Sequence, residues 1–297
     1  MDLVFQTTRF PHLGESFIGR GFSNIPGGKG ANQAVAISRQ GVDVTMLGKV
    51  GTDDNGLYLL NKLNDSGVDT SRIIIDDSSK TGLAVIMVDD NGQNMILVYP
   101  GANLELNPDE VKKSLENLDC AMIVSQLEIP DECVVAAYEM ATKLNIPFIL
   151  DAGPAKPFDL GLLNGLEILS PNETEAMALT GIECNNMADA KKASIKLRAM
   201  SGAKYIVIKL GGKGALLQDE DGAFSYFPAH QVNCVDETAA GDAFTAAMAT
   251  HYLKTNDIVK AINYANCAGA LAVMKLGAQT SLPTNLEIEY FTSNINE

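Results

Sequence analysis

Short apolar segments alternate along most of the chain with longer stretches whose apolar residues recur at helical spacing. This alternation predicts strands at 44–50, 121–126, 148–151 and 205–209, and a further short strand that ends at Leu169. It predicts helices at 31–39, 56–63 and 130–144, and another that starts near Asn172. Strands and helices in alternation form a largely parallel sheet covered by helices, so the pattern indicates an α/β fold.

Two stretches break this alternation. Residues 82–88 and 94–99 read as strands joined by the turn sequence Asp89-Asp90-Asn91-Gly92, which is typical of a hairpin. The first 25 residues are also strand-like. We expect these pieces to form a small sheet separate from the main one, either as a flap over a cleft or as a plain β-extension.

The overall charge limits the partners of the chain. It has 22 Lys and Arg against 37 Asp and Glu, a net charge of −15 at pH 7. Binding to the phosphate backbone of DNA or RNA needs a Lys/Arg surface, so we expect no nucleic-acid partner. A single nucleotide is still possible, because a glycine loop or a helix N-terminus can hold one phosphate group locally.

The sequence also bears on compartment and metal content. It contains no run of 18 apolar residues, and its first ten residues lack the basic-then-apolar order of a signal peptide. The five cysteines include no CxxC pair, and the three histidines show no metal-type spacing. We therefore expect structural thiols in a reducing cytoplasm, no membrane segment and no zinc site.

An early glycine-rich segment, Pro26-Gly27-Gly28-Lys29-Gly30-Ala31-Asn32-Gln33-Ala34, precedes a predicted helix. Its glycines let the backbone approach a ligand closely, and the helix offers free N–H groups. It matches neither the Walker A loop nor the dinucleotide-binding loop. The structural alternative is a tight connection.

A late segment runs from Asp236 to Phe244 and contains Ala239-Ala240-Gly241-Asp242. Small residues before Asp242 would open a helix whose first amides form an anion hole. A carboxylate there can accept a proton from a hydroxyl while the amides hold a phosphoryl group. The structural alternative is that Asp242 caps the helix.

Two further segments each follow a predicted strand. In Ser170-Pro171-Asn172-Glu173-Thr174-Glu175, the residues Asn172 and Glu175 are either a capping box or a site near phosphates and a magnesium-bound water. The segment Lys209-Leu210-Gly211-Gly212-Lys213-Gly214 either cradles a nucleotide or forms a hairpin corner.

The order and spacing of GGKGANQA, PNETEA, KLGGKG and DETAAGDAF resemble the ribokinase branch of the PfkB carbohydrate-kinase family. The resemblance covers essentially the whole chain, as one kinase domain over 1–297. It implies a Rossmann-like three-layer αβα sandwich with a small β-sheet lid formed by about 1–25 and 80–100. It also implies ATP-dependent phosphorylation of ribose at its 5-hydroxyl.

The resemblance assigns roles position by position. Asp242 matches the catalytic base, and Gly241 and Ala240 match the anion hole. The positions that match sugar-binding residues are Asp2, Gly28, Lys29, Gly30, Ala31, Asn32, Glu128 and Asp242. The positions that match nucleotide contacts are Asn172, Lys209, Leu210, Gly211, Gly212, Lys213, Gly214, Gly241 and Asn266.

The resemblance also implies ATP, Mg²⁺ and a K⁺ activator as cofactors. Glu175 would hold a water of the magnesium ion. The positions that match the monovalent-cation site, several through backbone oxygens, are Asp236, Thr238, Ala272, Lys275, Gly277 and Ser281.

The chain departs from the family pattern at three places. Family members usually begin with a strand and a Gly-Ser-x-Asn-x-Asp turn, which do not precede Asp2 here. We expect the functional chain to extend upstream by one strand; the alternative is a true start, with a weakened sheet and poor ribose binding. Glu237 stands where threonine is common, and Lys209 stands where a small hydroxyl residue is common.

Alternatives to a ribose kinase remain open from the sequence. One is a kinase for another small sugar such as deoxyribose, because a few lid residues can change specificity. Another is a catalytically impaired sugar or nucleotide binder. The resemblance suggests a homodimer joined through the lids, since exposed sheet edges need covering, and the alternative is a monomer whose lid folds on its own cleft.

Overall fold

The computed structural model describes residues 1–295, and a six-stranded sheet lies at its centre. The strand order is β12-β11-β10-β9-β8-β7, parallel from β7 to β10 and antiparallel from β10 to β12. The strands are β7 (Ile123–Ser125), β8 (Phe148–Asp151), β9 (Ile168–Ser170), β10 (Tyr205–Lys209), β11 (Gly214–Gln218) and β12 (Phe224–Pro228). Every residue of β8, β9, β10 and β11 is buried, so this sheet forms the middle layer of the molecule.

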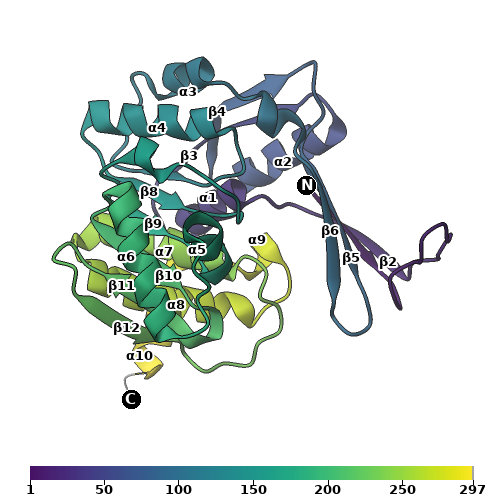
Figure 1. Ribbon diagram of the computed structural model, residues 1–297. Coiled ribbons are helices and arrows are strands. Elements are labelled where there is room, and N and C mark those ends of the chain that lie inside the picture. Colours follow the sequence, from purple (N-terminus) through teal and green to yellow (C-terminus); the bar gives the residue numbers. More distant parts are fainter. Residues whose placement is uncertain (296–297) are drawn as a thin grey trace.

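Helices cover both faces of the sheet, because successive side chains of a strand point to opposite sides. Leu150 and Leu169 pack into one helical layer, and Ile149 and Ile168 pack into the other. The first layer is α3 (Pro108–Leu115), α4 (Asp131–Leu144), α5 (Glu173–Thr180) and α6 (Met187–Ser201). The second is α7 (Ala240–Thr255), α8 (Ile258–Val273) and α10 (Asn285–Ile295). The expected three-layer α/β fold is confirmed, and Figure 1 shows its helices around the sheet.

Several short helical segments connect these elements. They are α9 (Ala278–Ser281) and the 3-10 helices η1 (Gly101–Glu105), η2 (Leu160–Leu163) and η3 (Gly211–Lys213).

A second, two-stranded parallel sheet pairs β3 (Thr45–Gly51) with β4 (Asp69–Asp76). It is flanked by α1 (Lys29–Arg39) and α2 (Asp54–Asp65). Within the described chain, β3 pairs with no strand besides β4, and β7 pairs with none besides β8. The main sheet is therefore split into two parts, where the sequence pattern alone indicated one.

A cavity of about 1030 Å³ lies against the open edges of β3 and β7. Val44 to Val50 and Met122 to Leu127 line it from the two strands, and α1, α3 and α4 also contribute to its walls. Ile123 and Val124 are only half-buried, although the equivalent positions of β8 are fully buried. These residues have no partner strand on this edge and face the cavity instead.

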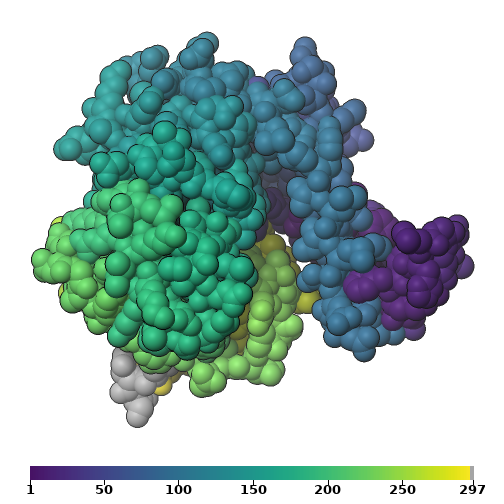
Figure 2. All heavy atoms as spheres, in the orientation of Figure 1, coloured from purple at the N-terminus to yellow at the C-terminus, as the bar shows by residue number. Residues whose placement is uncertain are grey.

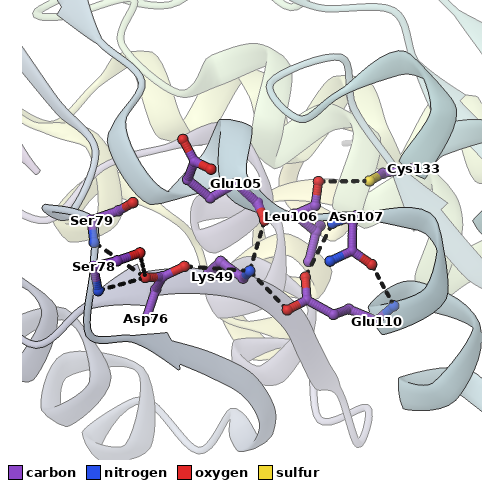
Figure 3. Close-up of polar contacts among 9 residues, drawn as sticks. All are labelled: Lys49, Asp76, Ser78, Ser79, Glu105, Leu106, Asn107, Glu110 and Cys133. Atoms are coloured by element: carbon purple, nitrogen blue, oxygen red, sulfur yellow. Dashed lines mark hydrogen bonds and ion pairs between the residues drawn. The ribbon is translucent and has the colours of Figure 1, made fainter.

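Lys49 holds the two-stranded sheet against its neighbours (Figure 3). Its ammonium donates to the backbone oxygen of Glu105 at 2.7 Å and to Glu110 Oε1 at 2.8 Å, and it lies 3.5 Å from Asp76 Oδ2. These contacts join β3 to β4, η1 and α3.

The third sheet has the order β2-β1-β5-β6 and extends away from the rest of the molecule (Figure 1). Its strands are β1 (Asp2–Gln6), β2 (Gly21–Ile25), β5 (Leu83–Val88) and β6 (Asn94–Tyr99). The predicted hairpin at Asp89–Gly92 joins β5 to β6, and Gly92 supplies the positive φ of 75° that the turn requires. Figure 2 shows the surface hollowed between this sheet and the main body.

No helix in the described part of the chain has the length and apolar character that crossing a membrane requires. The five cysteines are all unpaired. Within residues 1–295, no group of three or more His, Cys, Asp or Glu side chains is arranged to hold a metal ion.

Candidate active site

Asp242 lies in the first turn of α7, which begins at Ala240. The N-cap is Ala239, whose backbone is left-handed with φ 61° and whose side chain makes no capping hydrogen bond. The first amides of α7 are therefore uncapped by any side chain, a geometry suited to an anion. Because Ala239 is the cap, the structure excludes the alternative in which Asp242 caps this helix.

Both carboxylate oxygens of Asp242 accept hydrogen bonds from the start of α1. Asn32 Nδ2 lies 2.9 Å from Oδ2, and Gln33 Nε2 lies 3.1 Å from Oδ1. The early glycine-rich segment and the late Ala-Gly-Asp segment thus meet, as the sequence analysis expected of one site. Only 5% of Asp242 is exposed, so its carboxylate is fixed in one orientation.

The surroundings of Asp242 strengthen its affinity for a proton. Burial raises the pKa of Asp242, because the ionised carboxylate is poorly solvated there, and the charge of Asp151 also raises it. Lys29 and the hydrogen bonds from Asn32 and Gln33 act in the opposite direction without cancelling the rise. A raised pKa suits a group that takes up a proton near neutral pH.

Lys29 brings a positive charge to the same place. Burial alone would lower the pKa of Lys29, but the carboxylates of Asp151, Asp242, Glu175 and Glu128 outweigh that effect and raise it. The ammonium is therefore charged throughout the physiological pH range.

The glycine-rich loop approaches two acidic residues. Lys29 N donates a 3.0 Å hydrogen bond to Glu128 Oε2, and a Cβ added to Gly27 would lie 2.1 Å from Asp2 Oδ2. Gly28 has φ 95°, a conformation that favours glycine. Burial raises the pKa values of both Asp2 and Glu128. The structure therefore brings Asp2, Glu128 and the loop together at one site.

One acceptor in this site has no partner. Asn32 Oδ1 is buried, and no group within residues 1–295 donates a hydrogen bond to it. Buried acceptors are nearly always satisfied, so this oxygen is suited to receive a hydrogen bond from a ligand hydroxyl.

Among the residues that match nucleotide contacts, Asn172 follows β9 and Lys209 ends β10, whereas Asn266 lies in α8. Asn172 and Glu175 form a complete capping box for α5, with Asn172 Oδ1 accepting from Glu175 N and Glu175 Oε2 accepting from Asn172 N. The structural interpretation of this pair is confirmed, and it leaves Glu175 Oε1 for other contacts. Asn266 Nδ2 donates to the carbonyl oxygens of Phe227 and Pro228, each at 3.4 Å.

The turn after β10 is largely exposed, and two of its residues are glycines without side chains. Gly211, Gly212 and Lys213 are exposed, Leu210 is buried, and Gly214 has φ 108°. The Lys213 ammonium pairs with Glu173 at 3.2 Å.

Lys209 points away from this turn and into the protein. Its ammonium donates to Asp151 Oδ1 at 2.6 Å, and Asp151 is fully buried at the end of β8. Its side chain is therefore directed toward a buried network of hydrogen bonds that includes Asp151 and Asp242. It does not point toward the exposed turn, which was predicted to contact the nucleotide.

Three residues of this network were not singled out from the sequence. Asp151 Oδ2 accepts from Gln33 Nε2 at 2.7 Å, and Gln33 Oε1 accepts from Gln126 Nε2 at 2.5 Å. Gln33 belongs to the glycine-rich segment and Asp151 ends a predicted strand, so position in the motif and at a carboxyl end of the sheet was the available signal.

Three of the residues that match the monovalent-cation site are in contact, since Asp236 contacts both Thr238 and Gly277. Asp236 accepts hydrogen bonds from Thr238 Oγ1 at 2.6 Å and from Gly277 N at 2.8 Å. Partial burial would raise the pKa of Asp236, but these hydrogen bonds outweigh it and lower the pKa. The backbone N–H of Lys275 donates to Ala272 O at 3.2 Å. Ser281, which follows a few residues later in the chain, is fully buried. The structure therefore brings Thr238 and Gly277 into contact with Asp236.

The loop, the acidic residues and Asp242 face a common cavity, whose lining includes Asp2, Gly28, Lys29, Gly30, Ala31, Asn32, Glu128 and Asp242. Polar groups of both signs beside a buried carboxylate and an uncapped helix start can bind a polyhydroxyl compound and transfer a proton. Positioning and charge neutralisation of this kind are what phosphoryl transfer requires.

Comparisons with known proteins agree with this chemistry. The sequence profile described as pfkB family carbohydrate kinase matches residues 1–285. A ribokinase of Staphylococcus aureus is 38% identical over 293 residues, which cover 97% of this chain and 95% of that protein. A deoxyribokinase of Salmonella typhi is 34% identical over 298 residues, which cover 100% of this chain and 96% of that protein. The solved structure of Arabidopsis thaliana ribokinase complexed with ribose and ATP has a TM-score of 0.90 at 30% identity, covering 98% of this chain and 95% of that one.

Proposed function

This chain belongs to the pfkB family of carbohydrate kinases, and from that premise we propose that it phosphorylates D-ribose at the 5-hydroxyl with ATP, giving ribose 5-phosphate and ADP. The observation that carries the proposal is the buried Asp242 carboxylate at the uncapped start of α7, oriented by Asn32 and Gln33.

Asp242 is the general base. It accepts the proton of the sugar 5-hydroxyl as that oxygen forms a bond to the terminal phosphorus of ATP and the bond from phosphorus to the ADP oxygen breaks. The raised pKa of Asp242 favours this proton uptake. Transfer of the proton late in the step is consistent with a loose phosphoryl transition state.

The phosphoryl group passes between positive groups. The amides of Gly241 and Asp242 and the partial charge of the α7 N-terminus face it from one side, with Ala240 at the first helical position. The Lys29 ammonium, held in place by the surrounding carboxylates, adds a full charge.

The sugar lies between the loop and the acidic pair. Asp2 and Glu128 accept from its hydroxyls, and Asn32 Oδ1 receives the hydrogen bond that it lacks. Gly28, Gly30 and Ala31 allow the ring to approach the backbone. A site built of such groups rejects an analogue that lacks one hydroxyl, so ribose is favoured over deoxyribose.

The nucleotide lies over the carboxyl ends of β9 and β10. The exposed turn of Gly211 to Lys213, flanked by the buried residues Leu210 and Gly214, borders this region together with the Asn172 cap and Asn266. Gly241 joins it to the phosphoryl site.

Glu175 would position Mg²⁺ through a water, since its Oε1 is not used in the capping box. Such an ion would neutralise charge on the transferred group. K⁺ would be held by Asp236, Thr238 and Ser281 with backbone oxygens of Ala272, Lys275 and Gly277. The Asp236–Gly277 contact supports this assignment, because it joins both halves of the set.

The sheet β2-β1-β5-β6 acts as the lid, and the enzyme is a cytoplasmic homodimer joined through it. Residues Met95 to Tyr99 of β6 are 48–72% exposed, and such an apolar strand at a sheet edge favours pairing with a second copy. The five unpaired cysteines suit a reducing compartment.

The test is a coupled assay of ADP release with ribose, 2-deoxyribose and other pentoses, together with titration calorimetry of ribose. ADP release that is fastest with ribose supports the proposal. Fastest turnover of deoxyribose favours the second sugar kinase, and ribose binding without turnover favours a binding protein.

A further inference from the structure

The ion pair of Asp151 and Lys209 lies behind the proposed base and is not accounted for by sugar or nucleotide binding. Asp151 is 0% exposed and Lys209 is 9% exposed. An ion pair withdrawn from water to this degree is costly unless further hydrogen bonds complete it. Thr245 Oγ1 supplies one such bond to Asp151 Oδ2 at 3.2 Å and lies 3.5 Å from the Lys209 ammonium.

Gln33 connects this pair to the base. Its single side-chain nitrogen donates to Asp151 Oδ2 at 2.7 Å and to Asp242 Oδ1 at 3.1 Å. An amide nitrogen has two hydrogens, so both are used, and each points to a different carboxylate. Gln126 Nε2 donates to Gln33 Oε1 at 2.5 Å and holds the other end of the amide. Because ionised carboxylates only accept hydrogen bonds, the end of the amide that faces Asp151 and Asp242 is the nitrogen. The orientation of Asp242 is thereby tied to the position of Asp151.

The charge of Asp151 needs an opposing charge at this place. Two ionised carboxylates that share one donor repel each other, and the Asp151 charge raises the pKa of Asp242. Lys209 lies on the side of Asp151 away from the shared nitrogen, since it contacts Oδ1 whereas Gln33 contacts Oδ2. The charged groups around Asp242 are Lys29 and Glu128 on the sugar side, Glu175 near Lys29, and Asp151 with Lys209 behind.

We propose that Lys209 is a positioning residue for phosphoryl transfer: it holds Asp151, which through Gln33 orients the carboxylate of Asp242 and keeps it available as a base. The proposal rests on the proposed function, because it takes Asp242 as the base. It also accounts for a lysine at a position where a small hydroxyl residue is common in the family.

The test compares Lys209→Met, Asp151→Asn and the double variant in ribose phosphorylation. Lys209→Met leaves the Asp151 charge unopposed, so kcat should fall by about 10–100-fold, the order expected for a misplaced catalytic group. The KM for ribose should change much less, and the acid limb of the pH profile of kcat/KM should move to higher pH. The double variant removes both charges, so the limb should return toward its wild-type position and kcat should partly recover.

A matched control separates this role from plain stability. Lys49→Met breaks another ion pair of a buried lysine, at 2.8 Å to the half-buried Glu110, in a cluster that shares no hydrogen bond with Asp242, Asp151 or Gln33 (Figure 3). It should lower Tm and leave the acid limb and kcat of the folded enzyme unchanged. Wild-type kcat and an unmoved acid limb in Lys209→Met would overturn the proposal, as would a double variant no better than Lys209→Met.

Where Lys209→Met does not fold, Asp151→Asn keeps the proposal testable. Removing the like charge should move the acid limb to lower pH. The kcat should fall because Lys209 and Gln33 contact opposite oxygens of Asp151, and the asparagine would turn its NH2 group, a donor, toward one of these two donors. An unchanged profile and kcat would overturn it. The first measurement is ribose turnover by the unmodified enzyme and its loss in Asp242→Asn. If the unmodified enzyme does not turn over ribose, or if Asp242→Asn retains the activity, the proposed function fails independently of the role of Lys209.

Discussion

Asn32 donates a hydrogen bond of 2.9 Å to Oδ2 of Asp242 across 210 residues of sequence. This contact joins the first turns of α1 and α7, so two helix N-termini converge on one carboxylate. The glycine-rich loop and the uncapped start of α7 are thereby held in a single arrangement.

Asn32→Ala removes this hydrogen bond from the ionised form of Asp242. That bond lowers the pKa of Asp242, so its loss should raise the pKa further and move the acid limb of kcat/KM to higher pH. We expect kcat/KM to fall by about 10²-fold, since the sugar also loses the free Oδ1 acceptor. A pH–rate series measures both effects, and an unmoved limb would show that Asn32 does not act on the base.

Gly27→Ala should damage the sugar site. The added Cβ would lie 2.1 Å from Asp2 Oδ2, closer than any tolerated contact, so Asp2 or the loop must move. The KM for ribose should rise about tenfold or more, while the KM for ATP changes little. Gly48→Ala is the matched control, because its Cβ would meet only Met46 Cε at an ordinary 3.6 Å. Equal KM values for ribose in the two variants would contradict the assignment of Asp2.

K⁺ should stimulate the enzyme, because a cation beside Asp236 would brace the loop that leads into α7. Asp236→Asn should abolish the stimulation, since the residue would lose its charge and its Gly277 contact would weaken. The measurement is the rate in potassium buffer against the rate in sodium-free tetramethylammonium buffer. Equal rates for the unmodified protein would argue against a cation site.

The open edges of β3 and β7 lead to a prediction about stability. Each unpaired buried backbone group costs about 1–3 kcal/mol, so several of them would use much of a domain's stability of about 5–15 kcal/mol. Adding roughly 14 residues before Met1, an apolar strand followed by a short turn, should raise Tm and strengthen ribose binding. An extension of equal length with charged residues at the apolar positions is the control. If the apolar extension and the unextended chain melt and bind ribose alike, the strand gap has no energetic importance.

Local pattern predicted the elements that are buried on both faces. The strands at 148–151 and 205–209 occur where the apolar runs indicated, and the hairpin at Asp89–Gly92 followed from its turn residues. The strand predicted at 121–126 is shorter, Ile123–Ser125, because its second edge has no partner strand to extend the pairing.

Contacts between distant segments could not be predicted in the same way. The motifs identified Asp242 and the glycine-rich loop, and the structure brings them together. No local pattern indicated that Lys209 turns inward, because that direction depends on Asp151, 58 residues earlier in the chain. Gln33 was visible within a motif, yet its bridging role exists only once both carboxylates are in place.

The central claim is that Asp242 takes the proton of the sugar hydroxyl, and Asp242→Asn tests it most directly. Asparagine keeps the shape of the side chain and cannot accept that proton. Coupled ADP release with ribose should fall by about 10²–10⁴-fold, while calorimetry shows ribose binding only modestly weakened. Turnover close to that of the unmodified enzyme, in a folded variant that binds ribose, would contradict the account.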